Sequence, residues 1–165
     1  MEGALRILIV DRGTVLERCA LSLANTLEAE VTMMHDAGQL LEFCRSSKPD
    51  VIIAELVLDY GSGGEELGGE FDVMQLEATL RALKKLHQEG HLEGVCVIAT
   101  HSGSFPVAKL ARLVARGVVR ALLEKPLDPD DLRACVCNYL GITDPLSGFS
   151  HWKPDNALAQ AVVVE

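Results

Sequence analysis

Aromatic residues are scarce in this sequence. Phe, Trp and Tyr together make up 4% of it, although 48% of the residues are hydrophobic. Aliphatic side chains must therefore fill the interior. Such side chains are typical of a parallel sheet that is buried on both faces between helices. The composition thus favours an α/β domain over a sandwich of antiparallel sheets.

Long apolar runs are also missing. No stretch approaches the ~20 apolar residues that a membrane-spanning helix needs. The apolar run at residues 7–10 is too short for the core of a signal peptide. We therefore expect a cytoplasmic protein without a membrane segment.

Positive charge is in the minority, since 15 Lys and Arg residues face 24 Asp and Glu residues and the net charge is −9. An acidic chain is repelled by phosphate backbones and by anionic lipid surfaces. Neither nucleic acid nor a membrane is therefore an expected partner.

The five cysteines are an odd number scattered through apolar segments, which is typical of free, buried thiols in a reducing compartment. Cys135 and Cys137 form a C-x-C pair, but on a helix residues two apart do not face each other. No second Cys/His pair follows at the spacing of a zinc site. We expect no metal site.

Five short aliphatic runs alternate with amphipathic ones along the chain. The expected strands are residues 5–10, 30–34, 51–58, 95–99 and 118–123, and the first four expected helices are 14–27, 38–46, 71–89 and 106–115. A fifth helix begins at Pro129 after the capping residue Asp128 and ends before Gly141. Strands and helices that alternate in this way form a parallel sheet with right-handed crossovers.

Two segments fall outside this pattern. Residues 59–70 carry several glycines among acidic residues, which predicts an extended loop. Residues 142–165 follow the last expected helix and look like an appended, partly disordered C-terminal arm. Phe149 and Trp152 in this arm fold back either onto the domain or onto a partner. The domain itself is expected to span residues 1–141.

Polar side chains follow four of the expected strands. In an open parallel sheet, ligands bind beyond the carboxyl ends of the strands. The residues at these ends include acids, a hydroxyl and cations: Asp11, Arg12, Glu55, Thr100, His101, Lys125 and Pro126. They converge on one edge of the predicted sheet, which is therefore the candidate functional site.

Four segments carry a family resemblance: ILIVD at residues 7–11, PDVIIAE at 49–55, VIAT at 97–100 and LEKPL at 123–127. In this order and spacing they resemble the landmarks of response-regulator receiver domains of the CheY-like superfamily. The resemblance covers residues 4–141. It implies a flavodoxin-like three-layer αβα sandwich, with a five-stranded parallel sheet in the order 2-1-3-4-5.

In that family, two acids after strand one hold magnesium together with an aspartate of strand three, which accepts a phosphoryl group. A Ser or Thr and a Lys then bind the phosphoryl oxygens. By resemblance, Asp11 matches the first acid, Thr100 the hydroxyl and Lys125 the lysine. The resemblance also implies a cis peptide bond between Lys125 and Pro126.

Two positions depart from the family pattern. Arg12 stands where the second acid would be, and Glu55 stands where the phosphoacceptor aspartate would be. Magnesium requires oxygen ligands, so a guanidinium removes a ligand and adds repulsion. Arg12 can instead pair with Glu55 or Asp11. We expect no bound cofactor, magnesium included, and a loss of magnesium-dependent phosphorylation.

The role of Glu55 stays open. Its longer side chain reaches into the space of a phosphoryl group, so it either mimics the phosphorylated state or anchors Arg12 and Lys125, and a purely structural ion pair is a third possibility. His101 is expected at the rim of the pocket. Leu122 occupies the position of the family's aromatic switch residue, which argues against aromatic switching.

The sequence thus predicts an atypical, stand-alone receiver-like module that is not an enzyme. It would bind a signalling protein in trans, either a kinase or an output protein. By family analogy, a homodimer would form through the fourth helix, fifth strand and fifth helix. Three alternatives stay open: a phosphoacceptor at Asp59, a small hydrolase or transferase with His101 as base, and a structural assembly domain.

Overall fold

A single parallel sheet forms the centre of the molecule. The computed structural model describes residues 3–11, 16–56, 69–101 and 107–153. The sheet has five strands in the order β2-β1-β3-β4-β5, and all neighbouring pairs are parallel. The strands are β1 (Arg6–Val10), β2 (Glu30–Met34), β3 (Val51–Leu56), β4 (Cys96–His101) and β5 (Ala121–Glu124). The predicted strand order is therefore confirmed.

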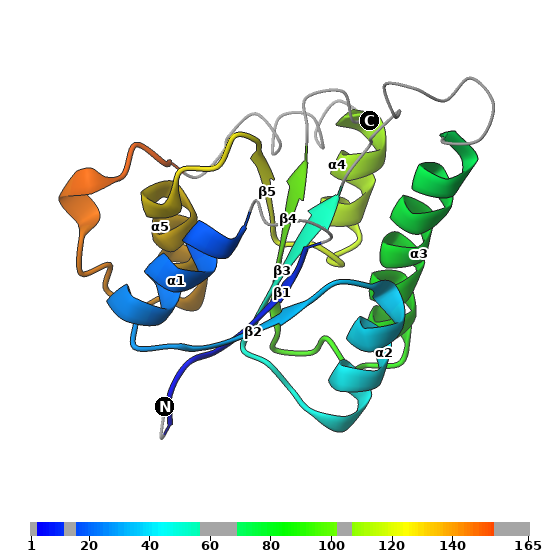
Figure 1. The fold of residues 1–165 in the computed structure, drawn as a ribbon, viewed down its shortest axis with the longest axis horizontal. Coiled ribbons are helices and arrows are strands. Elements are labelled where there is room, and N and C mark those ends of the chain that lie inside the picture. The colour runs from blue at the N-terminus through cyan, green and yellow to red at the C-terminus, as the bar shows by residue number, and fades with distance from the viewer. Residues whose placement is uncertain (1–2, 12–15, 57–68, 102–106, 154–165) are drawn as a thin grey trace.

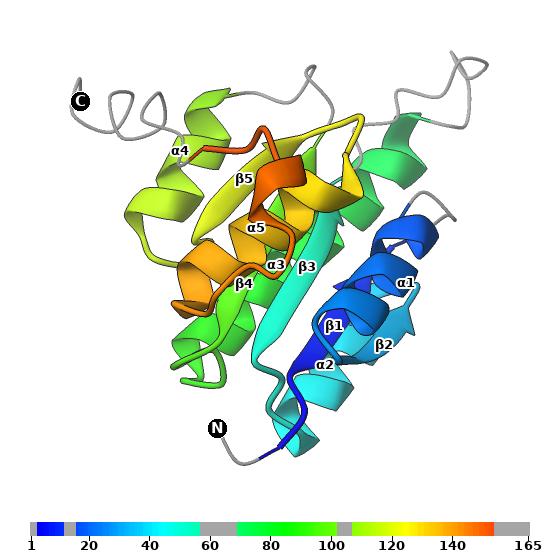
Figure 2. The ribbon, with the colours of Figure 1, turned by 90° about the vertical axis from the view of Figure 1, so that its left-hand side faces the viewer.

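Helices cover both faces of this sheet (Figures 1 and 2). One face carries α1 (Glu17–Thr26) and α5 (Pro129–Leu140). The other carries α2 (Ala37–Ser46), α3 (Gly69–Gln88) and α4 (Val107–Ala115). The three layers confirm the flavodoxin-like αβα sandwich.

The central strand β3 is buried along its whole length. Ile52 and Ala54 belong to the core cluster on the α2–α4 face, whereas Val51 and Ile53 belong to the cluster on the α1–α5 face. This division follows from the alternation of side chains along a strand. Glu55 continues the same strand and is only 7% exposed, so a carboxyl group lies within a buried, otherwise aliphatic segment.

The fifth strand is shorter than predicted, because it begins at Ala121 and not at residue 118. The N–H groups of Val118 and Val119 donate to the carbonyl of Leu113 (3.0 and 3.3 Å) and so close the end of α4. Both valines are buried. A buried turn and a buried strand have the same apolar sequence, which explains the wrong boundary.

The fourth strand is longer than predicted. Thr100 and His101 continue the ladder of β4 and pair with Glu55 and Leu56 of β3. Apolar pattern alone ends this strand at Ala99, because the two residues that follow are polar although they keep strand geometry.

The expected loop 59–70 is also corrected, since Gly69 and Glu70 already belong to α3. The apolar pattern of this helix starts at Phe71, and such a pattern cannot reveal a first turn without apolar residues. The rest of the loop, and residues 57–58 at the expected end of strand three, lie outside the described residues.

The ends of α5 are as predicted. The Asp128 side chain accepts a hydrogen bond from the N–H of Asp130 (2.8 Å), and Pro129 fills the first helical position. Gly141 ends the helix with φ of 67°, a conformation that glycine adopts without steric cost.

Residues 142–153 fold back along the outer side of α5, and we call them the strap (Figures 1 and 2). The strap contains a short 3₁₀ turn at Ser147–Phe149. Ile142 and Trp152 pack against the core cluster of the α1–α5 face, whereas Phe149 is 68% exposed. Trp152 thus folds back onto the domain.

The sequence also led to expectations about thiols, metals and membranes. All five cysteines are free and buried. Within the described ranges, no three His, Cys, Asp or Glu side chains are grouped so that they could hold a metal ion. No helix in that part of the chain combines the length and the apolar character that spanning a bilayer requires.

Candidate functional site

The predicted site residues meet at the carboxyl edge of the sheet. Glu55 and Thr100 are register partners on β3 and β4. Asp11 directly follows β1, whose last residue, Val10, pairs with Ala54 of β3. The backbone register therefore places Asp11, Glu55 and Thr100 side by side, as the rule about strand ends predicts.

Glu55 and Lys125 form an ion pair between Oε1 and Nζ. The carboxylate side chain is 4% exposed and the ammonium side chain 19%. Lys125 directly follows β5, so this contact links the ends of β3 and β5. Limited exposure to water strengthens the attraction between the two charges.

Two features of its surroundings change the pKa of the Lys125 ammonium in opposite directions. Burial lowers the pKa of the Lys125 ammonium, and the carboxylate of Asp11 acts to raise it. The Lys125 backbone N–H donates to the carbonyl of His101 (2.8 Å), which fixes the start of the connection to α5. The peptide bond to Pro126 is cis, as the resemblance implied.

Asp11 is fully buried at the point where β1 leads to α1. Its Oδ2 accepts a hydrogen bond from the N–H of Leu16 (2.9 Å), and its own N–H donates to the carbonyl of Met34 (2.9 Å). The carboxylate is thus tied to the residue that precedes α1, and its charge acts on Lys125 from a fixed position.

Thr100 is fully buried, and within the described part of the chain its Oγ1 has no hydrogen-bond partner. A buried hydroxyl without a partner is unfavourable, because its hydrogen bonds to water are lost and not replaced. The edge of the sheet therefore contains a polar group that is not satisfied by the ion pair beside it.

His35 is a residue of this edge that the sequence reasoning missed. It follows β2, and its Nδ1 donates to the backbone carbonyl of Asp11 (2.7 Å). The rule about strand ends was applied to four strands only; applied to the second strand, it would have found His35. A cavity of about 320 Å³ lies beside it and is also lined by Val10, Glu55 and Thr79.

Two further predicted residues flank the site. His101 ends β4, pairs with Glu124 across the ladder and is partly buried, as a rim residue would be. Leu122 is 7% exposed and belongs to the core cluster on the α2–α4 face. The residue that the resemblance matched to the family's aromatic switch is thus an aliphatic side chain in the core.

Arg12 and Asp59 lie outside the described residues. The pairing of Arg12 with Glu55 or Asp11, and the alternative phosphoacceptor at Asp59, therefore stay predictions.

Two acids described at this edge already have partners within the chain. Magnesium prefers several oxygen ligands in octahedral geometry. The carboxylate of Glu55 is already paired with Lys125, and one oxygen of Asp11 accepts a backbone hydrogen bond. We therefore derive no chemistry through a metal.

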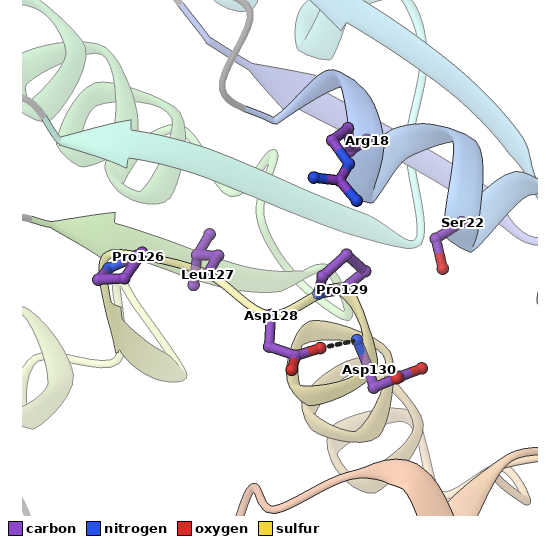
Figure 3. A pocket seen from close by; sticks show the side chains of 7 residues that line it. All are labelled: Arg18, Ser22, Pro126, Leu127, Asp128, Pro129 and Asp130. Carbon is purple, nitrogen blue, oxygen red and sulfur yellow. Dashed lines mark hydrogen bonds between the residues drawn. The ribbon is translucent and has the colours of Figure 1, made fainter.

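A shallow cleft lies between α1 and the connection from β5 to α5 (Figure 3). Arg18 and Ser22 of α1 line one side, and residues 126–130 line the other. The hydrogen bond from the Asp130 N–H to Asp128 holds the second side in place. The cleft begins one residue after Lys125, so the ion pair and this surface share one connection.

Comparison with known proteins gives matches among solved structures only. No protein-family model matches the sequence, and no curated protein sequence matches it. The receiver domain of a CheY-like response regulator from Methanospirillum hungatei is 19% identical with a TM-score of 0.61, over 84% of this chain and 95% of that one. The signal receiver domain of an HD domain-containing protein from Pseudomonas fluorescens is 20% identical with a TM-score of 0.62, over 86% and 90%.

The chain has the fold of a response-regulator receiver domain. An adenylate cyclase structure from Rhodopirellula baltica has a TM-score of 0.62 at 18% identity, over 84% of this chain and 89% of that one. At these identities the likeness concerns the receiver fold alone, because one fold supports many activities.

Proposed function

We propose that this receiver-like domain is an atypical signalling module that acts by binding another protein, without magnesium-dependent aspartyl phosphorylation. The observation that carries this proposal is the ion pair between Glu55 and Lys125. In receiver domains that are phosphorylated, the corresponding lysine binds a phosphoryl group on the third strand. Here Lys125 binds a carboxylate that belongs to the chain itself.

The pairing has a chemical consequence for phosphorylation. Transfer of a phosphoryl group relies on a metal ion and fixed cations that neutralise charge on the transferring group. Lys125 is engaged by Glu55, so this cation is not free to neutralise a transferring phosphoryl group. The same ion pair thus occupies the cation and one oxygen of the carboxylate.

Glu55 replaces only part of what a phosphoryl group would contact. Its carboxylate reaches Lys125, but the hydroxyl of Thr100 keeps no partner among the described residues. The charge at the strand ends is therefore permanent, while the hydroxyl contact is absent. This favours a domain that is held in one arrangement and is controlled by its partner.

The partner we propose is a signalling protein, a kinase or an output protein, bound in trans. The net charge of −9 disfavours nucleic acid. The surface formed by α4, β5 and α5 is the proposed contact face, and it includes the strap because the strap lies on α5 (Figure 2). We propose neither catalysis nor a bound cofactor.

Intact-protein mass spectrometry after incubation with acetyl phosphate and magnesium tests this proposal. Wild type, Glu55→Gln and Asp59→Asn are treated side by side, and an active receiver domain serves as the positive control. No phosphoryl adduct is expected in any of the three. An adduct lost only in Glu55→Gln would identify Glu55 as an acceptor, and one lost only in Asp59→Asn would move the acceptor to Asp59; either result overturns the proposal.

A second measurement separates a signalling module from a purely structural domain. Affinity capture with wild type and with Glu55→Gln should yield a partner that only one of the two retains, because the charge at the strand ends differs between them. Equal capture by both would show that the site does not govern binding.

A further inference from the structure

The strap is bound to α5 through a buried cation. Arg133 is fully buried although it lies on the outer half of a helix. Its Nε donates to Asp144 Oδ1 of the strap (2.7 Å), and a terminal nitrogen donates to the strap carbonyl of Leu146 (2.9 Å). The other terminal nitrogen pairs with Asp130, one turn earlier on α5. A guanidinium without these partners would be buried at high cost.

A carboxylate on the same helix binds the far end of the strap. Asp131 Oδ1 accepts hydrogen bonds from the hydroxyl of Ser150 (3.1 Å) and from the backbone N–H groups of His151 (2.9 Å) and Trp152 (3.0 Å). Arg133 and Asp131 project from different sides of α5, since they are two residues apart. The strap therefore crosses the first turns of the helix from one side to the other.

Apolar contacts complete the docking. The rings of Tyr139 on α5 and Trp152 on the strap lie 6.1 Å apart at 58°, within the range of favourable aromatic pairs. Ile142 and Trp152 both pack against the core cluster of the α1–α5 face. The docked strap thus brings together a cation and a carboxylate, a carboxylate and backbone donors, and two aromatic rings.

These contacts join α5 and the strap, which meet at Gly141. Each copy of the protein carries both elements: the outer face of α5, and a strap with a matching carboxylate and indole. A second copy therefore offers the same helix face and the same strap, so each contact that forms within one chain can also form between two chains. Reciprocal exchange of an identical element gives a closed, two-fold dimer that repeats the contacts already made within one chain.

We propose that the outer face of α5 is a binding surface for the strap of a second copy, so that two chains exchange straps to form a reciprocal dimer. At low concentration each strap docks on its own helix, since a short tether gives an effective concentration on the order of millimolar. Exchange then becomes significant as the chain concentration approaches that value. The Glu55 site takes no part in this exchange, which uses only the α5 and strap portion of the contact face proposed above.

A pair of charge-reversed variants tests the exchange. In Asp144→Arg, the strap cannot dock on its own Arg133, and in Arg133→Asp the helix cannot hold its own strap. When the two variants are mixed in equal amounts, the strap of Asp144→Arg carries the charge opposite to that on the helix of Arg133→Asp. The strap of Arg133→Asp likewise carries the charge opposite to that on the helix of Asp144→Arg. A single chain with both substitutions is the matched control, because it restores the match within one copy.

Two signals follow the docking directly. Trp152 is the single tryptophan of the chain, so its fluorescence reports the strap alone. Cys137 is 2% exposed, and both Asp144 and Arg133 act on its thiol, so its alkylation reports the uncovering of α5. Cys135, on the inner side of the same helix, is the internal control and should stay protected.

Each variant alone is expected to show an exposed Trp152, with Cys137 labelled at least tenfold faster than in wild type. In sedimentation and native mass spectrometry, the mixture should form heterodimers that contain one chain of each variant. Trp152 and Cys137 should be protected again in these heterodimers. A mixture that stays monomeric and exposed, while the doubly substituted chain regains protection, overturns the proposal.

The wild type provides a second test should the reversed pair not dock even within one chain. Unlabelled and ¹⁵N-labelled wild-type protein are mixed at about millimolar concentration, the range of the effective concentration given above. Mixed dimers with protected Trp152 are expected to appear slowly, because each strap must first leave its own helix. Native mass spectrometry that finds only monomers under these conditions would overturn the exchange.

Discussion

The carboxylate of Glu55 and the ammonium of Lys125 meet across an intervening strand, because β4 lies between β3 and β5. Neighbouring strands are about 4.8 Å apart, so the two backbones are separated by roughly 10 Å. Two long side chains are needed to close this gap above the end of β4. The extra methylene of Glu55, compared with aspartate, brings the carboxylate toward Lys125.

The first prediction is that Glu55→Gln destabilises the fold. The substitution leaves the Lys125 ammonium partly buried, with Asp11 as a nearby carboxylate. A buried charge that loses its partner costs about 1–3 kcal/mol. Urea unfolding of wild type, Glu55→Gln, Lys125→Gln and the double variant gives the coupling between the two residues. A coupling indistinguishable from zero would show that the ion pair does not contribute to stability.

The second prediction concerns the hydroxyl of Thr100, which has no hydrogen-bond partner among the described residues. Thr100→Val should be neutral or stabilising by up to about 1 kcal/mol, because a buried polar group without a partner is replaced by a methyl of similar shape. Thr26→Val is the matched control, since Thr26 Oγ1 donates to the carbonyl of Ser22 (2.6 Å) and the same substitution should cost about 1 kcal/mol. A larger loss at Thr100 than at Thr26 would reveal a hidden ligand of the hydroxyl.

The third prediction is that acid opens the strap. Partial burial alone would raise the pKa of Asp144, but hydrogen bonds from Arg133 and from the Leu146 N–H hold it below its ordinary value of 3.8. A carboxyl whose pKa is depressed by docking stabilises the docked state above its ordinary pKa and loses this contribution as the pH falls through the depressed value. Trp152 fluorescence should therefore stay constant from pH 7 to about 5 and change below about 4.

Two variants distinguish this transition from general acid unfolding. Asp144→Asn should remove the low-pH step of Trp152, whereas Glu93→Gln, at an exposed acid away from the strap, should leave it unchanged. Asp130 and Asp131 also contact the strap or Arg133, so their variants are expected to shift the step without abolishing it. An identical step in Asp144→Asn would contradict the assignment to Asp144.

The fourth prediction is that the cysteines react slowly in the native protein. Burial raises the pKa of Cys44 and of Cys96 to about 11, and burial raises that of Cys135 as well. Two pKa units reduce the reactive thiolate at pH 8 by about 100-fold. Alkylation at pH 8, followed by peptide mass spectrometry, should find these three residues unmodified until guanidinium is added. Rapid labelling of Cys44 or Cys96 in the native chain would contradict their burial.

Much of the candidate site could be predicted from the positions of polar residues after apolar runs. Glu55, Thr100 and Lys125 were placed together because parallel strands end at the same edge. The choice among the proposed roles of Glu55 depended on geometry, since a carboxylate at a strand end has several possible partners. The structure shows the contact with Lys125. His35 follows the second strand, and the same rule selects it once that strand is included.

The strap shows where sequence reasoning fails. Arg133 lies in an amphipathic helix where a cation usually faces water, so its complete burial could not be inferred from spacing. Burial arises because Asp144, eleven residues later, supplies the opposite charge. Such a pair leaves no periodic signal, and it forms only once the chain has turned at Gly141.

The family resemblance implied the strand order. The sequence by itself determined the alternation of strands and helices and the edge of the sheet where the polar residues gather. These depend on local periodicity and on chain connectivity, which a sequence states directly. Only the tertiary structure decided which charges pair, which hydroxyl finds no partner in the described part of the chain, and where residues 142–153 lie. Those outcomes depend on distances between segments far apart in the chain, and on the loss of water that makes each pairing favourable or costly.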